Sequence, residues 1–238
     1  MKLFKNLRQV LIKEGNFKKY LWYAIGEIFL VMIGISLAFQ LDNWNENRLK
    51  KYTEVSYYQN IKEQITDDKN LINELILFNN RYMLEFQYAN QILEVNDRSR
   101  IDTLGLIVRN LTQYSDFDKK GNIHETLVNS GEIKLLQNHN IVKSIRSLEE
   151  KYNYINRMEN IHYDAVMSHV IQTINPLIKF SNAQIQKPDQ IYNYEFQNIV
   201  LSLIQVMTEK DEVYKEALSK IDKITYLIDK ELGIDNGK

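Results

Sequence analysis

The sequence predicts an all-α protein in which one N-terminal transmembrane helix continues into an irregular antiparallel bundle of long helices with short helices inserted. Two observations carry this prediction. The run 20–41, YLWYAIGEIFLVMIGISLAFQL, is apolar apart from a single carboxylate, Glu27. The whole chain of 238 residues contains only two prolines and eight glycines, and this scarcity favours long uninterrupted helices over strands joined by tight turns.

The composition excludes several classes of protein. An apolar content of 44% and a charged content of 26% are enough for one domain of ordinary size beyond the anchor. The net charge of −1 argues against a nucleic-acid partner, because no excess of cations is present to neutralise phosphates. The absence of cysteine excludes a disulfide scaffold, a thiol nucleophile and a thiolate metal site.

The run 20–41 is long enough to cross a bilayer. As a helix it spans roughly 33 Å, close to the roughly 30 Å of hydrocarbon in a membrane. Bulky polar residues follow it where a signal peptide needs a small-residue cleavage site, so we expect an uncleaved anchor. Trp22, Tyr23 and Trp44 flank the run and suit the two interfacial aromatic belts. These flanking residues disfavour the alternative, a buried core helix.

Positive charge is concentrated before the apolar run. Residues 1–19 carry six lysine or arginine residues against one acid, with apolar residues at helical spacing, which predicts a basic amphipathic segment on the cytoplasmic leaflet. The residues just after the run offer only Arg48, Lys50 and Lys51. The positive-inside rule therefore predicts a bacterial inner-membrane protein with a cytoplasmic N-terminus, a periplasmic domain over 42–232 and a flexible tail over 233–238.

A carboxylate and small residues share one face of the predicted span. At about 100° per residue, four residues lie within about 40° of one line: Glu27, Val31, Gly34 and Ala38. Gly34 and Ala38 permit close helix approach, and a carboxylate in hydrocarbon should face protein or water. We therefore expect this face to associate with another helix. Two alternatives stay open: Glu27 reaches the cytoplasmic headgroups without a further role, or it conducts protons or ions.

A heptad-like seam follows the apolar run. From 43 to 96 there is no proline or glycine, and the seam residues step by alternating threes and fours. They are Tyr58, Ile61, Ile65, Asp68, Ile72, Leu75, Asn79, Tyr82, Phe86, Ala89 and Leu93. This pattern predicts one long helix that continues from the span. Asn79 suits a register-fixing contact in a parallel oligomer, but apolar residues beside the seam favour packing on later helices of the same chain.

Short elements are predicted after a polar break at 96–100. A short helix is expected over 102–112 with Asp102 as its N-cap, followed by a loop over 113–122. Two short helices come next, and Ser130-Gly131 ends the first of them.

Two long helices complete the predicted bundle. The first begins after Asn138, which can act as its N-cap, and runs to about residue 173. A connection over 181–190 contains Pro188 as a helix stop. The last helix is expected to cover 194–232.

The sequence contains none of the common catalytic or phosphate-binding motifs. His162 and His169 lie on one face of a helix with Glu159 one turn earlier, but two turns separate the imidazoles by about 10 Å, too far to share one metal ion. We expect polar packing there. Asp67 and Asp68 are expected to form a solvated pair. We predict no catalytic residue, no cofactor and no metal ligand.

Residues 23–48, YAIGEIFLVMIGISLAFQLDNWNENR, resemble the signature of a family of uncharacterised single-pass membrane proteins from Bacteroidota. The matching features are Ala-Ile-Gly-Glu-Ile at 24–28, Ile-Gly-Ile at 33–35, Ala38, Gln40 and Asn-Trp-Asn-Glu at 43–46. A second stretch, 125–152, resembles the family's Leu-x-x-Ser-Gly-x-x-x-Leu-Ile-x-Asn pattern, with Leu136 in place of Ile. The resemblance implies no enzyme activity and no catalytic residue, and it makes Glu27 part of the family's motif.

These observations together predict a non-enzymatic inner-membrane scaffold or accessory subunit. Its partners are expected to be membrane lipid and either further copies of itself or other membrane proteins. One alternative is a subunit of a complex driven by the proton-motive force, with Glu27 as the ionisable group. Another is a periplasmic ligand sensor in which the loop 113–122 and the Ser130-Gly131 corner cap a small pocket.

Overall fold

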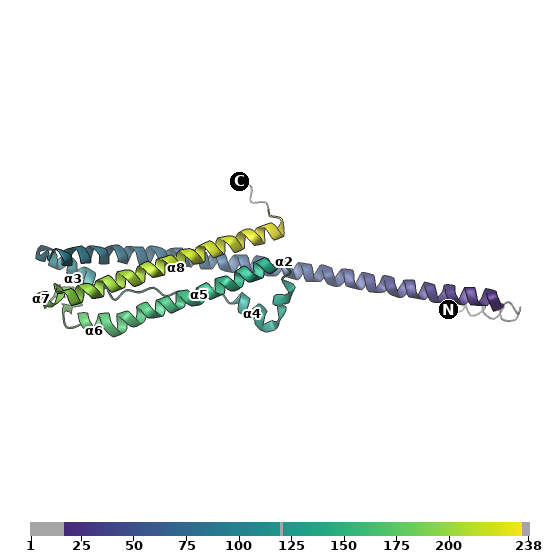
Figure 1. Ribbon diagram of the computed structural model, residues 1–238, viewed down its shortest axis with the longest axis horizontal. Helices are drawn as coiled ribbons and strands as arrows, with labels where there is room; N and C mark the ends of the chain where they lie inside the picture. The colour runs from purple at the N-terminus through teal and green to yellow at the C-terminus, as the bar shows by residue number, and fades with distance from the viewer. Residues whose placement is uncertain (1–16, 120, 235–238) are drawn as a thin grey trace. The chain divides into compact units, whose positions relative to one another are not determined.

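The computed structural model describes residues 17–119 and 121–234, and these fall into two compact units that divide between Glu54 and Val55. The described residues are almost entirely helical, as predicted (Figure 1). Most of the predicted basic segment and the last four residues of the predicted tail lie outside the described residues.

Helix α2 runs without interruption from Phe17 to Glu94, over 78 residues. Its first part makes up the described portion of the N-terminal unit, and its second part, from Val55, belongs to the C-terminal unit. The prediction that the apolar run continues into one long helix is confirmed. The absence of proline and glycine between 43 and 94 explains this continuity, because neither a missing donor nor a flexible backbone interrupts the hydrogen-bond ladder.

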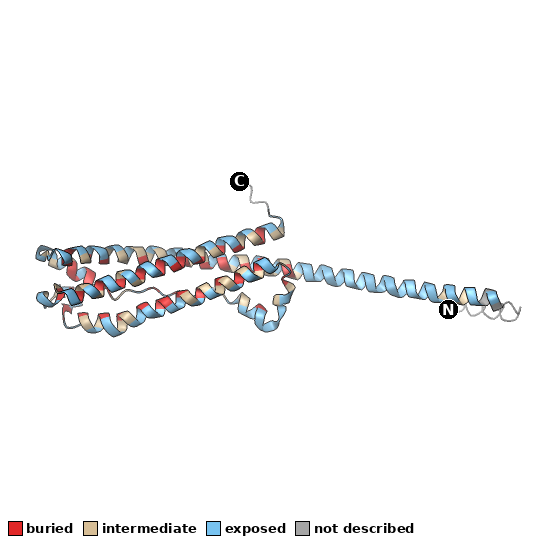
Figure 2. Cartoon of the chain, viewed as in Figure 1, coloured by how far each residue is buried: buried red, intermediate tan, exposed pale blue. Residues whose placement is uncertain are grey.

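The C-terminal unit is a bundle of three long helices: the second part of α2, α5 (His139–Ala165) and α8 (Tyr194–Leu232) (Figure 1). Helix α8 runs antiparallel to α2, since Lys62 pairs with Asp229 whereas Asn79 bonds to Met207. Helix α5 runs parallel to α2, since its N-cap Asn138 bonds to Tyr58 whereas Val166, after its end, shares a core cluster with Phe86. The buried residues line the faces where these helices meet (Figure 2).

The seam of α2 packs inside the bundle of its own chain. Nine of its eleven residues are buried, and the other two, Leu75 and Tyr82, pack partly buried against the core. The Asn79 side-chain amide donates to the carbonyl oxygen of Met207 on α8, at 2.8 Å. The polar seam residue thus fixes the register of two helices within one chain, and the bundle interpretation of the seam is confirmed.

Asp68 corrects the prediction of a solvated acidic pair. Asp67 is exposed, but Asp68 is fully buried because it occupies a seam position between Ile65 and Ile72. The buried charge of Asp68 acts on Tyr152 of α5. Burial raises the pKa of the Tyr152 hydroxyl, and the negative charge of Asp68 raises this pKa further. Adjacent residues of a helix point in different directions, so one aspartate can face the core while its neighbour faces solvent.

Short elements connect α2 to α5. They are η1 (Arg98–Arg100), α3 (Ile101–Asn110), α4 (Ile123–Ser130) and η2 (Glu132–Leu135). The helical region begins earlier than predicted. The N-cap residue is Asp97, whose carboxylate accepts from the backbone N–H of Ser99, and Asp102, the predicted N-cap, lies inside the first turn of α3. Gly131 ends α4 with a left-handed φ of 75°, as expected for a glycine in this position.

The predicted long helix from residue 139 contains a feature that the sequence did not reveal. Asn138 caps α5 as predicted, accepting from the backbone N–H groups of Asn140 and Ile141. A π-helical turn, η3 (Val166–Val170), then joins α5 to α6 (Ile171–Ile174). Such turns insert one residue into the ladder and often mark functional sites.

A small hairpin precedes the last helix. Strands β1 (Ile178–Lys179) and β2 (Gln184–Ile185) pair antiparallel, and α7 (Pro188–Ile191) follows. Pro188 occupies the first turn of α7, so it starts a helix where we predicted a stop. Helix α8 has the predicted bounds. Gly105 on α3 allows the hairpin to approach, because a Cβ there would overlap the carbonyl oxygen of Ala183.

Candidate functional site

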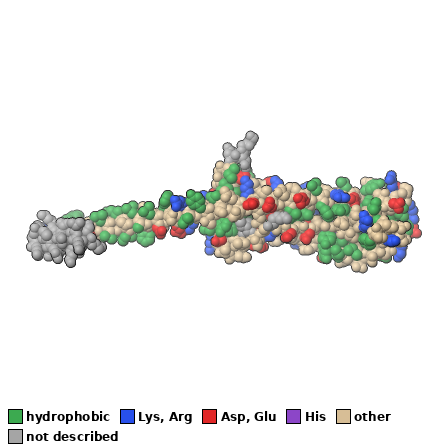
Figure 3. Space-filling model, turned by 180° about the vertical axis from the view of Figure 1, so that it is seen from behind, with side chains coloured by type: hydrophobic (Ala, Val, Ile, Leu, Met, Phe, Trp, Pro, Cys, Tyr) green, Lys and Arg blue, Asp and Glu red, His purple; other side chains and the backbone are tan. Residues whose placement is uncertain are grey.

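The apolar part of α2 is not covered by the rest of the described chain. Helix α2 is long and apolar enough to cross a membrane, and none of the residues in its most apolar stretch of 18 is buried. Figure 2 marks most of this stretch as exposed, and Figure 3 shows apolar side chains along the face of the helix that it draws. The exposed large apolar side chains include Ile28, Phe29, Leu30, Met32, Ile35, Leu37, Phe39 and Leu41.

The residues of the predicted association face lie on one continuous helix. This face, defined as Glu27, Val31, Gly34 and Ala38, keeps its predicted alignment because the helix is unbroken from Phe17 onward. Val31, Gly34 and Ala38 are exposed, and Glu27 is half-buried. A Cβ added at Gly34 would meet nothing within 4 Å, so space for close approach by another helix is present.

The predicted interface anchors lie at the two ends of the apolar run: Trp22 and Tyr23 in its first turn, and Trp44 three residues after its end. Trp22 and Trp44 are largely exposed, and Tyr23 is half-buried. The guanidinium of Arg48 lies 5.3 Å from the ring centroid of Trp44. An indole beside a cation at one end of an apolar helix is typical of the boundary between hydrocarbon and headgroups.

A second candidate site lies in the C-terminal unit, in the middle of the bundle. Five polar side chains from three segments are buried together: Ser115 from the loop after α3, Glu159 and His162 from α5, and Lys210 and Tyr214 from α8. Lys210 and His162 are each only 1% exposed, and Glu159 is 4% exposed. We refer to these five residues as the buried polar cluster.

Glu159 is the centre of the buried polar cluster. Its Oε1 accepts hydrogen bonds from the hydroxyl of Ser115, at 3.1 Å, and from the hydroxyl of Tyr214. Its Oε2 accepts from the backbone N–H of Phe117, at 2.5 Å. The ammonium of Lys210 lies 3.6 Å from Oε1 and donates to the Ser115 hydroxyl at 2.5 Å. Burying a charge is costly unless it is paired and hydrogen-bonded, and here the carboxylate has both kinds of partner.

The position of Lys210 indicates which ring nitrogen of His162 carries the proton. Its Nζ lies 3.3 Å from Nδ1 of His162. Because an ammonium can only donate, Nδ1 must carry a lone pair and the imidazole proton sits on Nε2. Burial, and then the positive charge of Lys210, lower the pKa of His162 to about 3. Burial also lowers the pKa of Lys210, an effect that the Glu159 carboxylate opposes, and burial raises the pKa of the Tyr214 hydroxyl.

The buried polar cluster was only partly predicted. The expectation that Glu159 and His162 take part in polar packing is confirmed, but Lys210, Tyr214 and Ser115 were missed. The sequence did contain a signal for Lys210 and Tyr214, because both continue the helical spacing of threes and fours that the buried residues of α8 follow. This stripe of buried residues contains Leu203, Met207, Lys210, Tyr214, Ala217, Ile221, Ile224 and Ile228. Nothing in the sequence places the loop residue Ser115 against this stripe.

A polar hollow of about 220 Å³ opens beside the buried polar cluster. It is lined by the loop after α3 and by α5, through Tyr114, Ser115, Asp116, Glu159, Asn160 and Tyr163. Three residues at the start of the predicted loop 113–122 therefore line a pocket, and the ligand-sensor alternative stays a prediction. Ser130 and Gly131, which that alternative also places at the pocket, are not among the lining residues.

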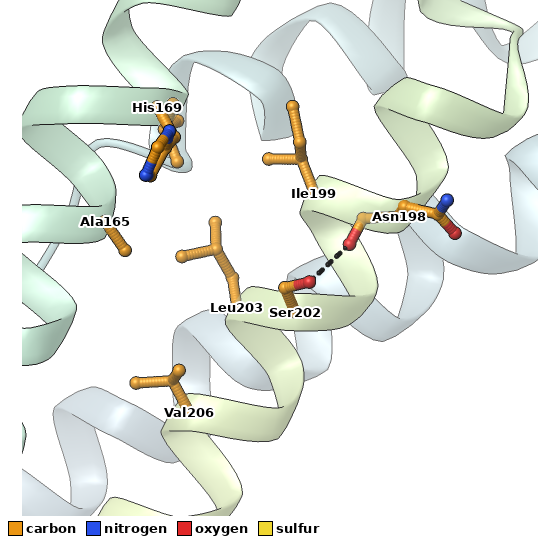
Figure 4. A pocket seen from close by; sticks show the side chains of 8 residues that line it. Ala165, His169, Asn198, Ile199, Ser202, Leu203 and Val206 are labelled. Carbon is orange, nitrogen blue, oxygen red and sulfur yellow. Dashed lines mark hydrogen bonds between the residues drawn. The ribbon is translucent and has the colours of Figure 1, made fainter.

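A second hollow, of about 240 Å³, lies beside the π-helical turn (Figure 4). It lies between the end of α5 and α8, and the side chains of Ile199, Leu203 and Val206 make its lining mostly apolar (Figure 4). His169 reaches this hollow and not the buried polar cluster, so the two histidines that share a face in the sequence belong to different sites. The Ser202 hydroxyl donates to the Asn198 carbonyl oxygen within its own helix, at 2.8 Å.

Among the described residues, the buried polar cluster has no group of metal ligands beside it. No group of three or more His, Cys, Asp or Glu side chains in the part of the chain that the structure describes is placed to hold a metal ion. In the buried polar cluster, four donors already surround the one carboxylate, and these bonds tie the loop after α3 to α5 and α8.

Comparison with known proteins gives one match. The model of a family described as "Family of unknown function (DUF6090)" matches residues 27–211, which include the association face and most of the bundle. No curated protein and no solved structure matches the chain.

Proposed function

The chain belongs to DUF6090, a family of unknown function, and we propose that it is a non-enzymatic membrane-anchored scaffold or accessory subunit. One observation carries this proposal: the apolar part of α2 is exposed on all sides and is covered by nothing else in the described chain. Burying one large apolar side chain stabilises a protein by about 1.5–3 kcal/mol. Leaving a whole helix of such side chains in water is therefore strongly unfavourable, whereas a bilayer solvates them.

The proposed location is the bacterial inner membrane, with the N-terminus in the cytoplasm and the bundle in the periplasm. The distribution of charge supports this orientation, because lysine and arginine residues are concentrated before the apolar run. Just after the run, only Arg48, Lys50 and Lys51 carry positive charge within the next ten residues.

The association face is the proposed contact with a partner, which is either a second copy of the chain or another membrane protein. Lipid tails are as apolar as leucine, so helices associate in a membrane through close packing and polar contacts and not through the hydrophobic effect. Gly34 and Ala38 offer close packing, and Glu27 offers a polar contact. No other stretch of the apolar run combines these features.

Two glycines of α2 provide a matched test of this face. A Cβ meets nothing within 4 Å at either Gly26 or Gly34, so neither Gly26→Leu nor Gly34→Leu disturbs packing within the described chain. Gly34 lies on the association face, whereas Gly26 is about 100° away from Glu27 around the helix. We expect Gly34→Leu to weaken association at least about tenfold, a loss of about 1.4 kcal/mol, and Gly26→Leu to leave it unchanged.

The measurement is affinity purification of the full chain in mild detergent, followed by sizing and mass spectrometry of what copurifies. This experiment also distinguishes a homo-oligomer from an accessory subunit. Equal loss of association in both variants, or no loss in either, would sink the proposed face.

The single carboxylate of the apolar run favours one second candidate, a subunit of a complex driven by the proton-motive force. Apart from the tyrosine at position 23, Glu27 is the only ionisable acid or base between residues 21 and 41. Ionisable residues inside membranes often mark ion pathways. Copurification of a multi-span partner whose activity is lost with Glu27→Gln but kept with Gly34→Ala would support this candidate. Purification of a homo-oligomer alone would contradict it.

A further inference from the structure

We infer that the polar hollow beside the loop after α3 is a binding site for a small organic cation, of the alkylammonium class. The hollow lies entirely within the C-terminal unit, and its proposed role does not depend on the association face. Its volume of about 220 Å³ is that of several water molecules, which suits a ligand of a few heavy atoms.

The charge of the site favours a cation. Asp116 and Glu159 contribute two carboxylates to the lining, and no lysine or arginine lines the hollow. Behind the lining, Lys210 lies 3.6 Å from Glu159 and offsets one of the two negative charges. One negative charge is left over, that of the exposed Asp116. A ligand with a single positive charge neutralises it.

The aromatic lining favours an organic cation over a metal ion. The rings of Tyr114 and Tyr163 meet edge to face, with 5.1 Å between their centroids, and both side chains are partly exposed at the hollow. Alkylammonium groups are attracted to the faces of such rings. A divalent metal ion prefers three or more carboxylate or imidazole ligands, and the described residues contain no such group.

The wall of the site is held in place before a ligand binds. Glu159 on α5 accepts from the backbone N–H of Phe117 and from the hydroxyl of Ser115, and these two bonds fix the loop that carries Tyr114 and Asp116. A pre-organised site does not have to order its side chains on binding, which favours affinity for a small ligand.

Choline and its neutral isostere 3,3-dimethylbutan-1-ol provide the direct test. The full chain is placed in nanodiscs of phosphatidylglycerol, which present no ammonium headgroup, and binding is measured by calorimetry against empty discs. We expect saturable one-to-one binding of choline, and binding of the neutral alcohol at least about tenfold weaker. Failure of choline to bind, or equal binding of the alcohol, overturns the inference.

Two aspartates of the same loop provide a matched pair of variants. Asp116→Asn removes the uncompensated charge at the hollow and should weaken choline binding about tenfold. Asp118→Asn removes the same charge from an exposed residue that does not line the hollow, and should leave binding unchanged. Equal effects of the two variants would show that choline responds to general surface charge and would contradict a defined site.

The ammonium group has two natural sources, a soluble amine or a lipid headgroup. Repeating the choline titration in discs that contain phosphatidylethanolamine separates them. Weaker apparent choline binding in these discs identifies the headgroup as the ligand source, and unchanged binding identifies a soluble amine. Either result supports the cation site.

Discussion

Replacing Glu159 with leucine is expected to lower the free energy of unfolding by about 3–5 kcal/mol. The physical reason is that Lys210, only 1% exposed, then loses the carboxylate with which it pairs in the core. The backbone N–H of Phe117 and the hydroxyl of Tyr214 lose their acceptor at the same time. The measurement is urea unfolding of the full chain in detergent, followed by circular dichroism.

The double variant Glu159→Leu, Lys210→Met is the control for this prediction. Removing both charges leaves no unpaired ion, and replacement of a buried pair by apolar residues of similar volume is often neutral or stabilising. We therefore expect the double variant to recover most of the stability that the single variant loses. A single variant as stable as the unmodified chain, or a double variant no better than the single one, would contradict the described role of the cluster.

The second large effect is a loss of stability at acid pH that depends on His162. Its pKa is about 3 in the folded chain, below the ordinary value of 6.5, so the unfolded chain binds a proton more readily. The stability that His162 contributes is therefore complete above pH 6.5 and is lost progressively as the pH falls toward 3. Linkage gives a loss of about 2 kcal/mol between pH 7 and pH 5 from this one residue.

The variant His162→Asn isolates this effect, because an amide does not titrate and can still accept from Lys210. We expect the difference in unfolding free energy between pH 7 and pH 5 to be smaller by about 2 kcal/mol in the variant. The contributions of the other titratable groups remain in both proteins and cancel in the comparison. An identical pH dependence in the two proteins would show that His162 is not held neutral in the fold.

The elements that the sequence predicted well depend on local signals. The continuity of α2 follows from the lack of proline along it and of glycine after Gly34, and the start of α5 follows from the N-cap Asn138. The bounds of α8, Tyr194–Leu232, follow from its apolar period and from the glycine after it. Each of these signals acts within a few residues along the chain, so the sequence alone contains it.

The features that were missed depend on contacts between distant segments. Lys210 was not expected inside the bundle because lysine is almost never fully buried unless it is paired, and its partner Glu159 lies on another helix. The π-helical turn at 166–170 and the helix that starts at Pro188 also have no unique local signature. Asp68 was expected in solvent because it is charged and adjacent to Asp67, but its position in the seam of α2 places it in the core.

We propose that α2 associates with a partner in the membrane through Glu27, Val31, Gly34 and Ala38. The chain has no cysteine, so a single cysteine carrying benzophenone can be introduced at each position from 21 to 41 in turn. We expect photo-cross-links, to a second copy or to another protein, to peak at positions 27, 31, 34 and 38. Cross-links spread evenly around the helix, or centred on the opposite face, would contradict it.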